Sequence, residues 1–179
     1  QFPDITSIVN NINTRRADVA FGESEIILHG APNIREKLGN ITFEISANSF
    51  FQTNTEQAEK LFLVVQENAG LTGKEIVFDL FCGTGSISLF LARYAKEIYG
   101  FDVIKSAIED ATRNAVVNGI GNTKFQKVNL DTYFKKGRNL DDYPTPDLLI
   151  LDPPRSGIHK NMVKSLPKFG SRRIVYVSC

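Results

Sequence analysis

The stretch from Glu75 to Ser86, EIVFDLFCGTGS, decides the fold. A short apolar run ends in an acid and a glycine-rich turn, and the residues that follow, SISLFLARYA, have a helical pattern. A strand that is apolar on both faces is typical of the interior of a parallel sheet. Glycine permits the tight turn from strand to helix and lets a ligand approach the backbone. The stretch therefore predicts one strand–turn–helix unit of an α/β protein.

The same alternation continues toward the C-terminus. Further strands are predicted at EIYGFDV (97–103), TKFQKVNL (123–130), DLLILD (147–152) and RIVYVSC (173–179), with helices at 86–95, 104–118 and 159–166 and a charged loop at 132–146. Strands that alternate with helices predict a Rossmann-like parallel sheet with helices on both faces.

The first third of the chain has a different pattern. Strands are predicted at SIVNNIN (7–13), SEIILHG (24–30) and ITFEIS (41–46), where apolar and polar residues alternate. A capping box of Thr53 and Glu56 predicts the start of a helix that ends at Gly70. We therefore expect a small β-rich N-terminal segment (1–52), a connecting helix (53–70) and an α/β domain (71–179).

Composition bears on where the protein is located and on the kinds of partner that it binds. The chain of 179 residues is 42% apolar and 23% charged, and its net charge of +1 gives no overall basic field. Two cysteines, Cys82 and Cys179, cannot form a disulfide framework or a metal cage alone, which favours a reducing, cytoplasmic location. No apolar run approaches ~18 residues. We expect no membrane partner, no metal in this segment, and a monomer.

The glycine-rich turn carries the first candidate ligand residues. Asp79 ends the strand, and Gly83 and Gly85 form the turn, but Ser88 stands where a dinucleotide fingerprint has its third glycine. An acid shortly before a G-x-G turn is typical of S-adenosylmethionine sites. The alternative is a tight turn that binds no ligand.

Two later strand ends add polar residues. Asp102 ends the next strand, where a carboxylate can accept both hydroxyls of a ribose, in either NAD or S-adenosylmethionine. Asn129 or Asp131 follows the third strand, where an adenine would lie. A solvated acid and an ordinary turn are the alternatives at these positions.

The motif LDPPRSG follows the fourth strand. Asp152, Pro153, Pro154 and Arg155 lie at the carboxyl edge, where open α/β sheets bind ligands. Two successive prolines fix the backbone and remove two N–H donors, so a rigid loop presents bare carbonyls beside the cofactor. This arrangement suits a methyltransferase that holds a planar nitrogenous base. A proline-rich turn without a ligand is the alternative.

Five motifs, SFFQTN, FDLFCGTGS, GFDV, LDPPRSG and IVYVSC, together resemble the RNA uracil-5-methyltransferases, which make 5-methyluridine in transfer and ribosomal RNA. The resemblance extends from about Asn13 to Cys179 and implies a class I methyltransferase fold, S-adenosylmethionine as cofactor and RNA as partner. It implies the following roles: Cys179 as nucleophile; Gln52 and Phe81 beside the cofactor; Asp152 as the site aspartate; Phe50 as a stacking surface for the uracil; and Arg155 as a phosphate or base anchor or a partner for Asp152. Core packing is the alternative for Phe50. It gives Cys82 no chemical role.

The resemblance also predicts whether this chain holds the whole catalytic domain. Family members continue past the catalytic cysteine with an Asn-Pro dipeptide, two further strands and a glutamate that removes the C5 proton. We therefore expect this chain to be an inactive fragment with an incomplete sheet. Two other functions stay open: an amino-group methyltransferase on adenine or guanine, with Cys179 inert, and a non-catalytic RNA-binding module of the same fold.

Overall fold

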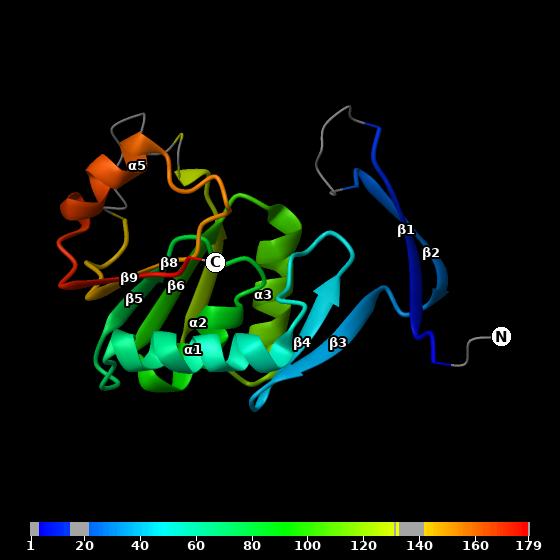
Figure 1. Cartoon of the computed structure of the whole chain (residues 1–179), viewed down its shortest axis with the longest axis horizontal. Helices are drawn as coiled ribbons and strands as arrows, with labels where there is room; N and C mark the ends of the chain where they lie inside the picture. The colour runs from blue at the N-terminus through cyan, green and yellow to red at the C-terminus, as the bar shows by residue number, and fades with distance from the viewer. Residues whose placement is uncertain (1–3, 15–21, 131, 133–141, 179) are drawn as a thin grey trace.

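A five-stranded parallel sheet forms the centre of the molecule (Figure 1). The computed structural model describes residues 4–14, 22–130, 132 and 142–178. The strands are β5 (Ile76–Asp79), β6 (Glu97–Asp102), β7 (Thr123–Lys127), β8 (Leu148–Leu151) and β9 (Arg173–Tyr176). Their order is β7-β6-β5-β8-β9 and every pairing is parallel, which confirms the predicted Rossmann-like sheet.

Apolar side chains cover both faces of this sheet. Successive residues of β5 point to opposite faces of the sheet and belong to two different clusters of buried apolar side chains. Val77 packs with the cluster that includes α1 (Thr55–Ala69) and α2 (Ser86–Leu91). Phe78 packs on the opposite face, with Met162 of α5 (Lys160–Ser165). Short 3-10 helices follow α2 and α5, at Ala92–Tyr94 (η1) and Leu166–Phe169 (η2). None of the helices in the described residues is long and apolar enough to span a membrane.

The start of α1 differs from the prediction. The helix begins at Thr55, and the side chain of Asn54 caps it by accepting a hydrogen bond of 3.1 Å from the Gln57 backbone N–H. Glu56 is then the second helical residue, one position too early for the box predicted with Thr53. The predicted end is confirmed, because Gly70 adopts a left-handed conformation and its N–H donates to the carbonyl of Gln66.

Two antiparallel hairpins precede α1. One joins β1 (Ser7–Ile12) to β2 (Ser24–Gly30), and the other joins β3 (Asn33–Leu38) to β4 (Ile41–Ser46). The strand β3 was not predicted, because its sequence NIREKL is largely charged and mostly exposed. It forms through its pairing with β4, whose Phe43 and Ile45 lie in the same core cluster as α1.

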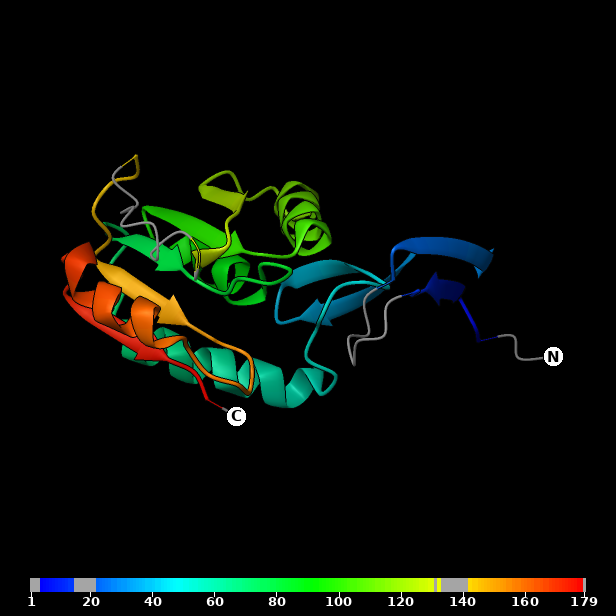
Figure 2. The ribbon, with the colours of Figure 1, turned by 90° about the horizontal axis from the view of Figure 1, so that it is seen from above.

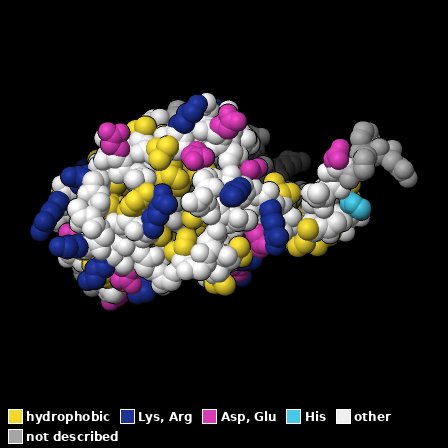
Figure 3. Space-filling view, turned by 90° about the horizontal axis from the view of Figure 1, so that it is seen from below, with side chains coloured by type: hydrophobic (Ala, Val, Ile, Leu, Met, Phe, Trp, Pro, Cys, Tyr) yellow, Lys and Arg dark blue, Asp and Glu magenta, His cyan; other side chains and the backbone are white. Residues whose placement is uncertain are grey.

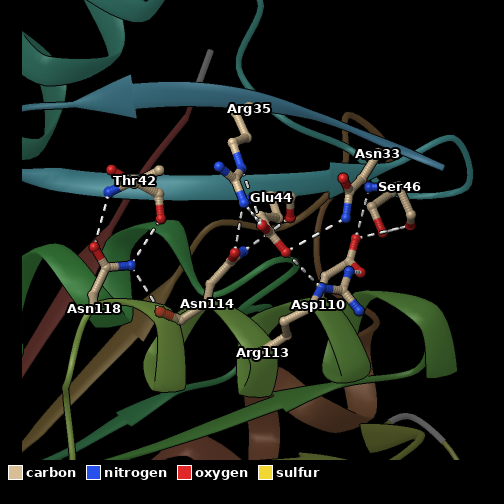
Figure 4. A network of polar contacts seen from close by, with 10 residues as sticks. Asn33, Arg35, Thr42, Glu44, Ser46, Asp110, Arg113, Asn114 and Asn118 are labelled. Carbon is tan, nitrogen blue, oxygen red and sulfur yellow. Dashed lines mark hydrogen bonds and ion pairs between the residues drawn. The ribbon is translucent and has the colours of Figure 1, made fainter. Parts of the chain in front are cut away.

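The free edge of β4 is bonded to a helix (Figure 4). Asp110, Asn114 and Asn118 of α3 (Lys105–Val117 with its C-cap) make what we call the polar ladder. Asn118 accepts from the N–H of Thr42 at 2.9 Å and donates to its carbonyl at 2.7 Å. Asn114 accepts from the N–H of Glu44 at 2.7 Å and donates to its carbonyl at 3.2 Å.

The third rung of the polar ladder uses a carboxylate. Asp110 Oδ2 accepts from the backbone N–H of Ser46 at 3.0 Å and from its hydroxyl at 2.8 Å. Four helical residues rise about 6 Å and two strand residues about 7 Å, so side chains at four-residue spacing meet every second residue of β4. The ladder thus covers an edge that would otherwise expose unpaired backbone groups.

Candidate functional site

Three predicted acids end three adjacent strands. Asp79 ends β5, Asp102 ends β6, and Asp152 follows β8. The sheet order changes direction between β5 and β8, since α2 and α3 lead to strands on one side of β5 and β8 lies on the other. Ligands of open α/β sheets bind at such a switch point, outside the carboxyl ends of the strands. The structure therefore brings these three acids to the edge where a ligand is expected.

The glycine-rich turn is bonded to β6. The N–H of Gly83 donates to Asp102 Oδ2 at 3.0 Å, and Asp102 Oδ1 accepts from the N–H of Ile104 at 2.9 Å. Both oxygens of Asp102 thus order the backbone around the turn, and each retains capacity for one further donor.

The two glycines of the turn are required for different reasons. Gly85 has φ +79°, and a Cβ there would lie 2.9 Å from the ring of Phe125 and 3.0 Å from Ala111. Gly83 has φ +52°, and a Cβ there would meet no atom of the described residues within 4 Å. The turn is therefore closely packed beneath Gly85 and open above Gly83, which leaves room for a ligand beside the backbone.

Asp79 is buried and only partly satisfied. Its side chain is 1% exposed, and Ser88 Oγ donates to Oδ2 at 2.7 Å. Oδ1 has no hydrogen-bond partner in the described residues. Burial, with smaller contributions from Asp152 and Asp102, raises the pKa of Asp79 to about 7 although Ser88 opposes the rise. Burial also raises the pKa of Asp152. The backbone N–H of Phe81 also lowers the pKa of Asp79, but no donor in the described residues reaches Oδ1 in good hydrogen-bond geometry.

The connection from β4 to α1 lies at this same edge of the sheet (Figures 1 and 2). Phe51 packs against Phe43 with ring centroids 5.1 Å apart, whereas Phe50 is 69% exposed. Gln52 lines a groove of about 490 Å³, together with Phe51 and residues of β1, β3 and β4. Phe50 is thus the more accessible of the two phenylalanines, while Phe51 is half-buried and lines the groove.

Four further predicted residues, Asn129, Phe81, Pro153 and Arg155, lie in or beside local turns and loops. Asn129 Oδ1 accepts from the N–H of Thr132 at 3.0 Å and so closes a turn after β7. Phe81 is partly buried against the apolar cluster that contains Phe78 and Met162. Pro153 is partly buried, and Pro154 accepts from the N–H of Gly157 at 2.8 Å, which leaves Arg155 exposed on the loop.

Of the two cysteines, the structure describes Cys82. Cys82 is buried, and burial raises the pKa of its thiol well above the usual range. It is therefore a protonated packing residue rather than a nucleophile. Cys179, the predicted nucleophile, lies outside the described residues, as does Asp131.

Sequence reasoning missed the residues that support the site. Ser88 was noted only as a missing glycine, yet it donates to Asp79. Phe125 packs against the glycine turn, and a Cβ at Gly100 would lie 2.5 Å from its ring. The polar ladder was also missed: Asp110, Asn114 and Asn118 recur every four residues on a predicted helix, but that spacing does not say which element they face.

Comparison with known proteins identifies relatives of this chain. A family model for tRNA (uracil-5-)-methyltransferases matches residues 24–179. An uncharacterised RNA methyltransferase of Chlorobaculum tepidum is 43% identical over 97% of this chain and 36% of its own length. One from Clostridium acetobutylicum is 43% identical over 98% of this chain and 38% of its own length. The chain thus spans less than two fifths of these relatives.

Solved structures agree with the sequence matches. The tRNA (uracil-54, C5)-methyltransferase of Pyrococcus abyssi, crystallised with S-adenosyl-L-homocysteine, is 34% identical with a TM-score of 0.74, over 98% of this chain and 42% of its own. The TYW2 protein of M. jannaschii is 20% identical with a TM-score of 0.55, over 80% of this chain and 60% of its own, which shows the shared fold alone. The fold is the class I methyltransferase fold. The chain belongs to the tRNA (uracil-5-)-methyltransferase family.

Proposed function

We propose that this chain binds S-adenosylmethionine at the carboxyl edge of β5, β6 and β8 and that the full-length protein methylates C5 of a uridine in RNA. The observation that carries the proposal is the set of Asp79, Asp102 and Asp152 on adjacent strand ends around an open glycine turn. The bound S-adenosyl-L-homocysteine in the related structure from Pyrococcus abyssi supports the choice of cofactor.

The residues present fit that cofactor. Asp79 Oδ1 lacks a donor, and the ammonium group of the cofactor can supply one. Asp102 retains acceptor capacity for ribose hydroxyls, and the space above Gly83 admits a ligand against the backbone. When bound, S-adenosylmethionine supplies a methyl group activated by a sulfonium. Gln52 and Phe81 are proposed to contact it, and Asn129 to contribute near the adenine.

The reaction at uracil requires covalent catalysis, since C5 is a weak nucleophile. In the proposed mechanism the thiolate of Cys179 adds to C6, which places an electron pair at C5. C5 then bonds to the methyl carbon as the carbon–sulfur bond of the cofactor breaks. A base, assigned by the family resemblance to a glutamate that follows the cysteine, removes the C5 proton. The electron pair then expels the thiolate, which restores the aromatic ring and the free enzyme.

The remaining predicted residues are proposed to hold the RNA. Phe50 is exposed at the edge of the site and offers a ring on which a flipped uracil can stack. Pro153 and Arg155 belong to the loop after β8, where a rigid backbone and a cation can grip the base and a phosphate. Since the chain spans only part of its relatives' length, we infer that it binds cofactor but forms no product alone.

Trapping on RNA that contains 5-fluorouracil tests the mechanism in the full-length protein. Only a nucleophile that adds to C6 leaves a covalent complex on a denaturing gel, because fluorine at C5 blocks the final elimination. We expect a complex with the unchanged protein and none with Cys179→Ser. A complex that persists in Cys179→Ser would remove that residue from the mechanism. Methyl product at an exocyclic amine would instead favour an amino-group methyltransferase, and no product of any kind a non-catalytic module.

A further inference from the structure

The charges of this chain are unevenly distributed along its sequence. The whole chain has 21 basic and 20 acidic residues, but every acid lies at or before Asp152. The residues after Asp152 include Arg155, Lys160, Lys164, Lys168, Arg172 and Arg173 and no Asp or Glu. The small net charge therefore conceals a strongly basic C-terminal segment.

The fold places most of these cations on one surface. Lys160 and Lys164 are exposed and lie one turn apart on α5, whose buried residues are Met162 and Ser165. At 100° per residue, both lysines face away from this buried side. Lys168 of η2 and Arg172 before β9 are also exposed. We call Arg155, Lys160, Lys164, Lys168 and Arg172 the basic stripe.

The basic stripe has no internal counter-charge. Within the described ranges, none of its members makes an ion pair, whereas other surface cations do: Lys105 lies 2.8 Å from Glu109 and Lys124 lies 2.5 Å from Glu97. Arg173 is excluded from the stripe because it donates to the carbonyls of Asn68 and Ala69 at the end of α1. Like charges at four-residue spacing destabilise a helix, so the stripe costs stability in the free protein.

The position of the basic stripe connects it to the candidate site. It starts at Arg155, in the loop that leaves β8 beside Asp152, and continues along α5 and η2 toward the start of β9 (Figure 1). Figure 3 shows the underside of the molecule, away from α5, where Lys and Arg side chains are interspersed with Asp and Glu. The stripe is thus a linear path of positive charge that leads away from the site.

We infer that the basic stripe binds the phosphate backbone of the RNA that flanks the target uridine, an inference that rests on the proposed function. Lysines one helical turn apart offer point charges at intervals of about 6 Å along a line, which suits a linear polyanion. Contacts of this kind fix the register of the nucleic acid without reading its sequence. An interface with an acidic protein would need a buried aromatic or apolar centre, and the stripe consists of exposed cations.

The test compares two variants with the same change of net charge. One carries Lys160→Glu, Lys164→Glu and Lys168→Glu, and the control carries Lys37→Glu, Lys60→Glu and Lys96→Glu at exposed positions on other elements. Fluorescence anisotropy measures the binding of a uridine-containing RNA stem-loop to the 179-residue chain at several salt concentrations. Circular dichroism and calorimetry with S-adenosyl-L-homocysteine check the fold and the cofactor site of each variant.

We expect the stripe variant to bind RNA at least about tenfold more weakly and its salt slope to fall by about 2, at roughly 0.7 per lost phosphate contact. The control should keep most of its affinity and the full slope. A milder set, Lys160→Gln, Lys164→Gln and Lys168→Gln, should lose the same slope with a smaller loss of affinity.

Three outcomes would overturn the inference. The first is that the folded chain binds no RNA, and the second is that the stripe and control variants lose equal RNA affinity. The third is that polyglutamate binds as tightly as RNA, which would assign the stripe to an acidic protein. In each case the cofactor site and uridine methylation could still stand. Conversely, stripe-dependent RNA binding by a full-length protein that makes no 5-methyluridine would reject the proposed function and keep the stripe.

Discussion

Asp110 in the polar ladder and Asp79 at the carboxyl edge are almost equally buried, at 2% and 1% exposure, but their carboxylates have different partners. Asp110 accepts from Ser46 at Oδ2 and pairs with Arg113 at Oδ1. Asp79 has one donor, Ser88, and its Oδ1 has none in the described residues. A buried acceptor without a donor costs free energy. The fold thus satisfies Asp110, which joins α3 to β4, and leaves one oxygen of Asp79 without a partner at the proposed cofactor edge.

The difference extends to the surroundings of each acid. The polar ladder uses short side chains to cover a strand edge, so every rung has both a backbone partner and a fixed geometry. At the carboxyl edge, the backbone is ordered by Asp102 and Phe125, while no atom of the described residues lies within 4 Å of a Cβ built on Gly83. Loss of a ladder residue should therefore reduce stability, whereas changes at the carboxyl edge should mainly alter ligand binding and its pH dependence.

The largest effect is expected from Asn114→Leu. Leucine keeps the branched shape of asparagine but is larger and has no hydrogen-bonding atoms, so the buried N–H and C=O of Glu44 lose their partners. Each unsatisfied group costs about 1–3 kcal/mol, so the free energy of unfolding should fall by about 2–6 kcal/mol. Urea unfolding followed by circular dichroism measures it. A loss below about 1 kcal/mol would show that water replaces the rung and would weaken the contrast with Asp79.

The pH dependence of stability comes next. The pKa of Asp79 is about 7 in the folded protein and 3.8 is its ordinary value. Between these values the unfolded chain is ionised at Asp79 while the folded protein holds the proton. The free energy of unfolding should therefore fall as pH rises through this window, by at most about 4 kcal/mol.

Asp79→Asn isolates this contribution, because an amide does not titrate. The difference in unfolding free energy between the unchanged protein and Asp79→Asn should shift in favour of the variant from pH 4 to pH 8, in urea titrations at both values. Parallel pH profiles for the two proteins would contradict the raised pKa of Asp79. The open oxygen would then have a donor, and the contrast with Asp110 would disappear.

A smaller effect is expected from Asp102→Ala on cofactor binding. The loss of hydrogen bonds to a charged acceptor should weaken binding of S-adenosyl-L-homocysteine by about 1–3 kcal/mol. Asp102→Asn is the matched control, since its remaining oxygen can still accept from Gly83 or Ile104 and order the turn. Isothermal titration calorimetry that gave equal affinities for Asp102→Ala and the unchanged protein would exclude Asp102 from the site.

The elements that could be predicted have a local sequence pattern of their own, whereas the elements that were missed depend on a partner elsewhere in the chain. The strands β5, β6 and β8 are continuous apolar runs that end in acids, so both the sheet and its candidate ligand edge follow from local patterns. The strand β3 was missed because NIREKL has no strand pattern of its own and depends on β4 for its pairing. The start of α1 was misplaced by one residue, since Thr53 and Asn54 are both good caps.

The polar ladder and Phe125 were missed for a different reason. Asn114 looks like a solvent-facing polar residue on a helix, and only the tertiary position of β4 makes it a buried partner. Phe125 looks like an ordinary strand residue, and its contact with Gly85 joins positions 40 residues apart in number. Contacts of this kind depend on how elements pack, which single-sequence patterns do not encode.

The smallest effect is expected from Asn48→Leu, which provides a half-buried counterpart to Asn114→Leu. Asn48 also links separate parts of the chain: it accepts from Asn11 Nδ2 and from the N–H of Gly22, each at 2.7 Å, and it donates to Glu25 at 2.7 Å. These contacts lie near the surface, so water can replace the lost partner, and the free energy of unfolding should fall by less than about 1 kcal/mol. The same urea titration measures it. A loss as large as that of Asn114→Leu would mean that burial does not distinguish the two asparagines, and the β1–β2 hairpin would then be held as firmly as β4.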